Sequence, residues 1–469
     1  MTPVDEKKWK IFFLVATSIF MSTLDSSIVN VALPYMMQDL QTDMQTIQWV
    51  VLIYLMTISS LLLTFGRLSD IKGRRSVYVL GFAIFVAGSL LCAMARTPQF
   101  LIVSRSVQGC GASMLMACSP ALIVDVFPVQ ERGKALGMIG AVVAAGLTTG
   151  PVVGGLILEY LSWRFIFYIN IPIGIAAAIG GMFILKSVHT ARGSYEPMDK
   201  TGSVLLIIMI SSLIIFLTQL SKWGIASILS LSFAGLCILA SIGFVTNEAR
   251  SDYPLFDMEL LKIKLFLFPV ISSAILFAAL FVIVFMMPFY LTYPCGFSAS
   301  KTGLIMIVLF LFLLFVSPVS GMLYDTFGSR RLCMMGMSVL AVSLISLMHV
   351  HPSMGVLSIL WRIALAGIGT ALYVSPNNTA IMSCVPLSRR GIASGAVATA
   401  RNLGMVVGVA LAGLIFTSSF SMLTNGSSLE NYLASMEPFF MISFKRTMLM
   451  GAILSIFGIG VTFARGKDH

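Results

Sequence analysis

Fourteen apolar runs follow one another along the 469 residues, and their length decides the fold class. A bilayer core about 30 Å thick is crossed by about 20 helical residues, because each residue advances the helix by about 1.5 Å. Charged residues make up only 10% of the chain, whereas soluble domains carry about 25%. The sequence therefore predicts an all-α polytopic membrane protein with 14 transmembrane helices. The runs cover residues 11–33, 47–66, 76–95, 99–124, 135–158, 165–185, 203–221, 225–246, 266–290, 302–322, 332–350, 355–380, 391–417 and 446–464.

The formal net charge of +11 raises the question of a nucleic-acid partner. Most of the 30 lysines and arginines, however, lie in alternate connecting segments, starting with the N-terminal one. Segments rich in these residues stay on the cytoplasmic side of membrane proteins. We therefore expect both termini in the cytoplasm, the chain in the inner (plasma) membrane of a bacterium, and no nucleic-acid partner.

The chain also repeats itself. A loop at residues 66–75 returns at residues 321–330 with the same spacing of glycine, aspartate and arginine. Parallel repeats of six spans are the arrangement of the two halves in the major facilitator fold. We predict an N-terminal six-helix bundle at residues 1–186 and a C-terminal six-helix bundle at residues 265–469. The linker between them, residues 187–264, carries the remaining two spans as an inserted hairpin.

Asp25 stands inside the first apolar run, where a carboxylate costs roughly 2.5–3.5 kcal/mol. An acid kept at such a cost predicts a functional site, and we expect it to bind a proton, because burial favours the protonated form of an isolated carboxyl group. Arg105 in the fourth run is followed by Gln108 and small residues, which indicates a side that faces a cavity. An arginine that reaches out to the membrane surface is the alternative.

The loop GRLSDIKGRR at residues 66–75 predicts a gate. It sets one acid among basic side chains at a helix end, and its copy keeps the acid. Such a cluster can hold two halves of a transporter together on the cytoplasmic side and release them. A positively charged loop with one acid is the plainer interpretation. The candidate gating residues are Gly66, Arg67, Asp70, Gly73, Arg74, Arg75, Asp325 and Arg330.

The fifth apolar run carries glycines around a proline. Small residues let two helices approach closely, and proline removes a backbone donor. We expect this run to form a groove for a neighbouring helix and to shape how the two halves rock. Its residues are Gly146, Gly150, Pro151, Gly154 and Gly155.

Together these motifs resemble one family. The stretch LDSSIVNVALP in the first run, the loop GRLSDIKGRR, the arginine motif at 101–112, the glycine-proline series and WRFIFYINIPIG at 163–174 are similar to the major facilitator superfamily. The closest resemblance is to its fourteen-helix drug:proton antiporters (EmrB/QacA-like). It implies that Asp25 binds the coupled proton, that Arg105 assists its transfer, and that Gly150-Pro151 marks export rather than uptake.

Two departures bear on the substrate. The position that the repeat equates with Asp25 is Ala279, and the last six runs hold no acid away from their ends. Arg362 and Arg401 instead place positive charge in the second half. One deep acid favours lipophilic monocations, neutral compounds or weak acids over divalent cations. The candidate residues of the substrate cavity are Asn30, Tyr54, Gln108, Phe281, Tyr373, Asn377, Asn378 and Arg401.

The predicted function is efflux of small lipophilic compounds or drugs by H+ antiport, driven by the proton gradient, with no cofactor, no metal and no enzymatic activity. The expected partners are a small-molecule substrate, protons and the lipid bilayer. A dedicated exporter of an endogenous metabolite, amino acid or lipid is the alternative, because it would share the fold. The longest predicted outer segment, residues 418–445, could contact a periplasmic adaptor, although a plain surface loop is favoured.

Overall fold

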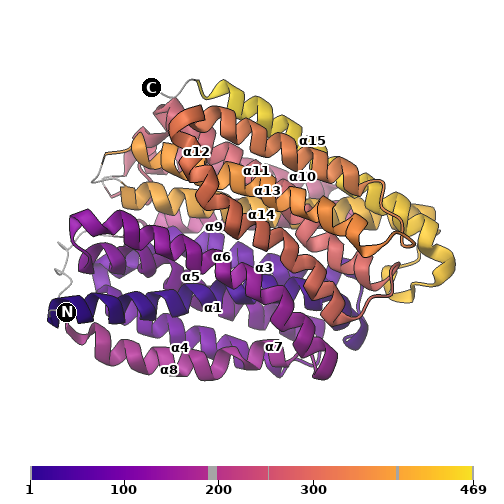
Figure 1. Ribbon diagram of the computed structural model, residues 1–469, viewed down its shortest axis with the longest axis horizontal. Coiled ribbons are helices and arrows are strands. Elements are labelled where there is room, and N and C mark those ends of the chain that lie inside the picture. The colour runs from indigo at the N-terminus through magenta and orange to yellow at the C-terminus, as the bar shows by residue number, and fades with distance from the viewer. Residues whose placement is uncertain (1–2, 188–197, 252, 387–389, 467–469) are drawn as a thin grey trace.

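The structure is a computed structural model that describes residues 3–187, 198–251, 253–386 and 390–466. Part of the predicted linker, residues 188–197, lies outside these ranges. Within the described ranges, thirteen helices are long and apolar enough to cross a membrane. They run side by side, and the start of the first helix lies at the same end of the molecule as the end of the last (Figure 1).

The helices follow the predicted runs closely and extend most of them by a few residues. They are α1 (Pro3–Asp39), α2 (Met44–Ile47), α3 (Trp49–Lys72), α4 (Arg74–Ala93), α5 (Pro98–Val126), α6 (Val129–Tyr160), α7 (Phe165–Tyr168), α8 (Asn170–Ile184), η1 (Leu185–Ser187), α9 (Lys200–Trp223), α10 (Ile228–Arg250), η2 (Met258–Lys262), α11 (Lys264–Thr292), α12 (Ala299–Leu347), α13 (Val356–Ser383), α14 (Arg390–Leu423), η4 (Leu429–Asn431), η5 (Ala434–Met436) and α15 (Glu437–Ala464).

Helix α12 has 49 residues, about twice the length that a bilayer requires. Gly328 inside it has φ 72° and ψ 161°, a conformation essentially restricted to glycine, so α12 consists of two helical arms that meet at this residue. Gly73, which the repeat equates with Gly328, separates α3 from α4 with φ 90°. The two copies of the loop therefore share a backbone hinge as well as a sequence.

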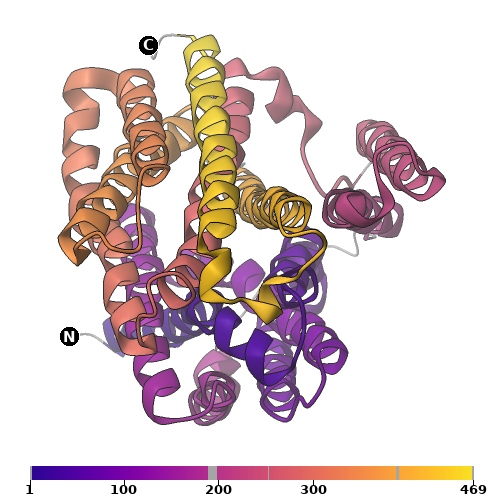
Figure 2. The same ribbon diagram turned by 90° about the vertical axis from the view of Figure 1, so that its right-hand side faces the viewer.

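Helices α1 to α8 form a first group and helices α11 to α15 form a second, and the two groups face each other (Figure 1). In the first group α1 packs on α6, and α5 packs on α3 and α4; in the second, α11 packs on α14 and α15, and α12 packs on α13. Between the groups, α6 meets α12 and α3 meets α14. The pair α9–α10 stands to one side in Figure 2, where α9 touches α3 and α14.

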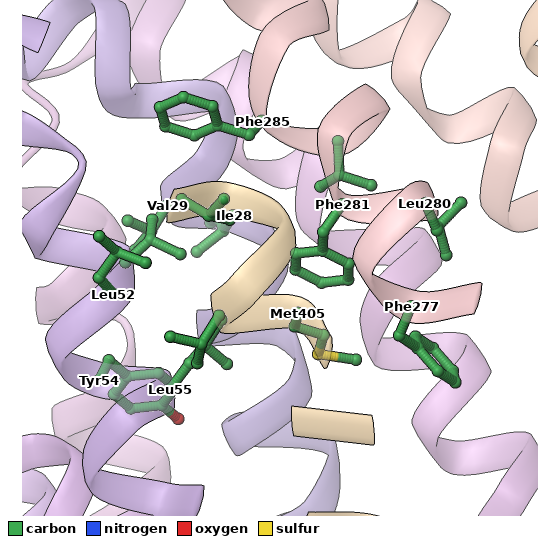
Figure 3. Close-up of a cluster of buried hydrophobic side chains, with 14 of the residues drawn as sticks. Ile28, Val29, Leu52, Tyr54, Leu55, Phe277, Leu280, Phe281, Phe285 and Met405 are labelled. Atoms are coloured by element: carbon green, nitrogen blue, oxygen red, sulfur yellow. The ribbon is translucent and has the colours of Figure 1, made fainter. Parts of the chain in front are cut away.

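Apolar side chains from both groups fill the space between them. Figure 3 shows Ile28 and Leu55 of the first group close to Phe281 and Met405 of the second. All four are buried. This shared cluster joins the two groups by van der Waals packing, in a region that holds no ion pair among the described residues.

Glycines on α6 allow α1 to approach it closely. A Cβ atom at Gly150 would lie 2.7 Å from the Cβ atom of Ser27, which real side chains cannot tolerate. Pro151 cannot donate to the carbonyl of Leu147, and the Ser27 hydroxyl donates to that carbonyl instead at 2.9 Å. The glycine-proline series therefore packs against a neighbouring helix, as predicted, and α1 supplies the hydrogen bond that the proline removes.

The same end of α6 also meets the second group. A Cβ atom at Gly155 would lie 2.7 Å from the carbonyl oxygen of Ala299, and one at Gly303 would collide with the carbonyl oxygen of Pro151. Helix α6 is thus held between α1 and α12 at the end where α1 finishes and α12 begins. We call this the closed end of the molecule.

Nearer the start of α6, the surroundings differ. Gly137 and Gly140 are exposed, and a Cβ atom at either would meet nothing within 4 Å. The tight packing of α6 is therefore confined to its second half, which contains Gly146, Gly150, Gly154 and Gly155. Gly137, with which the glycine pattern in the sequence begins, takes no part in it.

The prediction of a long outer loop at residues 418–445 is wrong. Helix α14 continues to Leu423 and α15 begins at Glu437, so the connection spans only residues 424–436. Arg446, in α15, donates to the hydroxyl of Ser419 in α14 at 2.8 Å. A polar residue ends an apolar run but does not end a helix, and here the two polar side chains join the extended helix ends.

We expect Gly150→Ala to lower the melting temperature measurably, because the added methyl group would push α1 away from α6. Gly140→Ala is the matched control in the same helix; it should leave stability unchanged or raise it by up to about 1 kcal/mol through helix propensity. Thermal unfolding of the purified variants in detergent tests this. Equal effects of the two substitutions would contradict the described α1–α6 contact.

Candidate functional site

Asp25 lies in the middle of α1 with 0% of its surface exposed. The guanidinium of Arg105 on α5, 1% exposed, donates from Nη1 to Asp25 Oδ2 at 2.5 Å. Arg105 therefore points into the helix bundle and not to the membrane surface. The two opposite charges neutralise each other, which reduces the large cost of burying either one alone.

Two amides complete the shell around the carboxylate. Gln108 Nε2 donates to Asp25 Oδ1 at 2.8 Å, and Asn170 Nδ2 donates to the same oxygen at 3.0 Å. Gln108 Oε1 in turn accepts from Arg105 Nη1 at 2.6 Å. We call these four residues the Asp25 network. Each partner of Asp25 in this network is a donor, so its two carboxylate oxygens together accept three hydrogen bonds.

The remaining contacts of Arg105 come from α3. Its Nε atom donates to the carbonyl of Val50 at 3.0 Å, and its guanidinium carbon lies 4.0 Å from the centre of the Tyr54 ring. The Tyr54 hydroxyl donates to the carbonyl of Ser22, one turn before Asp25, at 3.2 Å. Hydrogen bonds and cation–π contact thus tie α1, α3 and α5 to one buried arginine.

Asn170 is the member of the network that the sequence analysis missed as a site residue. It begins α8, and it lies within the motif WRFIFYINIPIG that carries part of the family resemblance. The sequence offered one signal for it, an asparagine inside an otherwise apolar run. Its carbonyl oxygen, Oδ1, is buried without a hydrogen-bond partner.

Tyr54 and Gln108, predicted to line the substrate cavity, lie in and around the Asp25 network with no exposed surface. Asn30 lies on α1, where its Nδ2 atom donates to the carbonyl of Ser26 at 2.7 Å. Phe281 is part of the apolar cluster between the two groups (Figure 3). A substrate contact for any of them stays a prediction.

Three further candidates lie on α13. Tyr373 and Asn377 are buried, and both donate to the carbonyl of Pro269 on α11, at 3.3 and 3.2 Å. The Tyr373 hydroxyl also bonds to that of Ser272. Their polar atoms therefore join α13 to α11 within the second group. Asn378, by contrast, is exposed.

Arg401 lies on α14, away from the Asp25 network. Its guanidinium carbon is 6.0 Å from the centre of the Phe277 ring on α11. Arg362 is different, because it donates to the carbonyls of Ser346 and Ser358 near the start of α13. Of Arg362 and Arg401, only Arg362 is held by hydrogen bonds within the described residues.

The predicted gating loop is organised by Arg74. This side chain pairs with Asp70 at 3.3 Å and with Asp125 at the end of α5, and it donates to the carbonyl of Ala121 at 2.9 Å. Asp70 is half exposed, and its ion pair with Arg74 stays within the first group of helices. The cluster therefore joins α3, α4 and α5 in this conformation.

The other gating candidates lie around this cluster or its copy. Arg75 donates to the carbonyl of Met182 at 2.8 Å, and Arg67 lies 6.0 Å from the Tyr253 ring. In the copy, Arg330 lies 4.3 Å from the Phe463 ring. Asp325 is exposed. Gly66 is partly exposed, and a Cβ atom added to it would meet nothing within 4 Å.

The fold and the buried network can now be compared with known proteins. A model of the Major Facilitator Superfamily matches residues 15–409. The chain belongs to this superfamily. It is an integral membrane transporter, as its relatives and its thirteen apolar helices both indicate, and its substrate is a small molecule.

Two relatives and one solved structure illustrate the range of the superfamily. The transporter is 33% identical over 417 residues to the riboflavin transporter RibZ of Clostridioides difficile, covering 89% of this chain and 90% of RibZ. It is 29% identical over 428 residues to the multidrug resistance protein Stp of Mycobacterium tuberculosis, covering 91% and 78%. A bacterial homologue of the human lysosomal transporter Spinster, in an inward-facing and unoccupied conformation, shares the fold with a TM-score of 0.69 at 13% identity, covering 99% of this chain and 97% of the other.

We expect Asp25→Asn and Arg105→Gln each to destabilise the transporter by about 3 kcal/mol, because each leaves one buried charge without its partner. The double variant should lose clearly less than the sum of the two. Thermal or denaturant unfolding of the four proteins in detergent gives this double-mutant cycle. Additive losses would mean that the two charges do not depend on each other.

Proposed function

We propose that this transporter exports small lipophilic compounds across the bacterial plasma membrane in exchange for protons. The chain would cross the membrane fourteen times, with the two arms of α12 as separate spans and α9–α10 as a hairpin inserted between two six-helix bundles. The observation that carries the proposal is the buried pair of Asp25 and Arg105. Asp25 is a fully buried acid in the middle of a spanning helix, and such acids serve as proton sites in many transporters.

The contacts of Asp25 suggest how a proton would act. Protonation would remove the counter-charge of Arg105 and turn one accepting oxygen into a donor that faces other donors. The protonated state would therefore favour a different arrangement of α1 against α5 and α8. Because Asp25 has no exposed surface, substrate would compete with the proton through this rearrangement and not by touching the carboxylate.

Helix α6 offers a route from Asp25 to the other half. Ser27, two residues after Asp25, holds the carbonyl of Leu147, and the second half of α6 packs tightly between α1 and α12. A shift of α1 would have to move α6 or separate α1 from α6 at the closed end. Proton binding in the first group would thereby alter the contact between the two groups, which is what alternating access requires.

The distribution of basic residues supports an orientation in which the closed end lies at the outer face of the membrane. The structure would then represent a state open to the cytoplasm, in which the gating cluster of Arg74, Asp70 and Asp125 does not bridge the two halves.

A dedicated metabolite exporter is the second candidate, and the named activity of RibZ favours testing riboflavin. A transport panel of riboflavin, ethidium, Hoechst 33342 and fluorescein would separate the two functions. Transport of riboflavin alone would favour the dedicated exporter, whereas transport of several unrelated compounds would favour multidrug efflux.

We expect Asp25→Asn to abolish transport driven by an imposed pH gradient in proteoliposomes. The matched control is Asp39→Asn, which removes an acid at the exposed end of the same helix, where it pairs with Arg164 at 2.9 Å. The control should keep wild-type coupling within about twofold, because exposed ion pairs contribute about 0–1 kcal/mol. Proton-driven transport by Asp25→Asn at the wild-type rate would rule out Asp25 as the coupling acid.

We also expect Gly303→Leu to disfavour the state with the closed end shut, because leucine would collide with α6 at Pro151. Overpacking costs about 1–3 kcal/mol, and about 1.4 kcal/mol changes the ratio of two states tenfold. Amide hydrogen exchange should rise at the end of α6 and the start of α12, and transport should fall. Gly235→Leu in α10 is the control, because a Cβ atom at Gly235 would meet nothing within 4 Å. Unchanged amide exchange in Gly303→Leu would contradict the described contact between α6 and α12.

A further inference from the structure

The buried charges of the described helices do not cancel. Asp25 and Arg105 neutralise each other inside the first group. Arg401 in the second group has no such partner: among the described residues no acid forms an ion pair with it. Arg362 also forms no ion pair with a described acid, but it donates to the carbonyls of Ser346 and Ser358, whereas the Nε atom of Arg401 has no acceptor among the described residues.

The acids nearest in sequence cannot supply the missing charge. Within helices α11, α12, α13, α14 and α15 the described acids are Asp325 and Glu437; Glu430, in η4 between α14 and α15, is exposed and forms no ion pair with Arg401 among the described residues. Asp325 is exposed next to the hinge at Gly328, and Glu437 is the first residue of α15 at the closed end. Neither forms an ion pair with Arg401.

The side chain of Arg401 is partly exposed, but its Nε atom is buried and makes no hydrogen bond within the described residues. Its closest aromatic contact, the Phe277 ring at 6.0 Å, is at the outer limit of a cation–π interaction. A buried guanidinium donor without an acceptor costs free energy, so a ligand that accepts from it would gain that energy on binding.

The face of α14 that carries Arg401 packs against α11 of the second group and against the apolar cluster between the groups. Gly404 and Gly408, three and seven residues on, contact the α11 backbone at Ala274 and Ala278. Met405, one turn on, lies beside Phe281 and Leu55 of the apolar cluster in Figure 3. Arg401 thus lies one turn from the cluster that joins the two halves, on the side toward the start of α14, which is the end opposite the closed one.

We propose that Arg401 binds an anionic group of the transported compound, so that the substrates are organic anions with an apolar body. A planar guanidinium binds carboxylate, sulfonate or phenolate oxygens through two donors at once, and the apolar cluster next to it suits a hydrophobic ring system. This assignment rests on the proposed transport function. Of the substrate classes expected from the sequence, the proposal keeps the weak acids and excludes the lipophilic cations, which Arg401 would repel.

Two dyes with the same ring system but opposite charge test the assignment. Fluorescein is an anion and rhodamine 6G is a cation, and both contain the xanthene core. Their dissociation constants would be measured by fluorescence polarisation with the purified transporter, wild type and three variants. Arg401→Gln removes the charge, Arg401→Lys keeps it, and Arg96→Gln removes an exposed loop arginine as the matched control.

We expect Arg401→Gln to weaken fluorescein binding about tenfold or more, as for the loss of a hydrogen bond to a charged group. Arg401→Lys should keep most of the affinity, Arg96→Gln all of it, and rhodamine 6G should bind no more weakly to Arg401→Gln than to wild type. Absence of saturable fluorescein binding, an unchanged fluorescein affinity in Arg401→Gln, or an equal loss for both dyes would overturn the proposal.

The outcome is separable from that of the proposed function. Fluorescein bound through Arg401 by a protein that moves no protons would contradict proton-coupled export and leave the anion site standing. Proton-driven export by a transporter whose fluorescein affinity is unchanged in Arg401→Gln would contradict the anion site alone.

Discussion

The buried ion pair between Asp25 and Arg105 is the interaction on which the first half of this transporter depends. Neither charge is stable alone inside a helix bundle, so α1 and α5 have to remain in the register that brings them together. Asn170 and Tyr54 bring α8 and α3 to the same point. One ion pair thereby orients four helices whose apolar surfaces, which lipid would also accept, could otherwise slide or rotate.

The position of this pair separates the proposed proton site from the proposed substrate site. Asp25 is enclosed within the first half, and the uncompensated charge at the boundary between the halves belongs to Arg401. In the proposed mechanism, protons act on the packing of α1, whereas the substrate meets α14 and the apolar cluster. The two events are then coupled through helix α6, whose glycines place it in contact with both α1 and α12.

The sequence predicted the features that depend on single residues or on regular spacing. Apolar runs located the spanning helices, the cost of a buried acid pointed to Asp25 as a candidate, and the repeat matched Gly73 with Gly328, which the structure shows to share a backbone hinge. It did not predict which helix faces which. The donation from Asn170 and the pairing of Arg74 with Asp125 come from helix rotation and packing, on which hydropathy carries no information. The prediction of a loop at residues 418–445 is wrong because Ser419 and Arg446 lie in helices, where Arg446 donates a hydrogen bond to Ser419.

The central claim is that Asp25 changes its protonation state when the network around it rearranges. Infrared difference spectroscopy of the transporter in lipid, between acidic and alkaline buffer, measures this directly through the carbonyl stretch of a protonated carboxyl group. The account predicts a band from a buried protonated carboxyl group in wild type and in Asp39→Asn, and its loss in Asp25→Asn. An unchanged band in Asp25→Asn, or no such band in wild type, would contradict it.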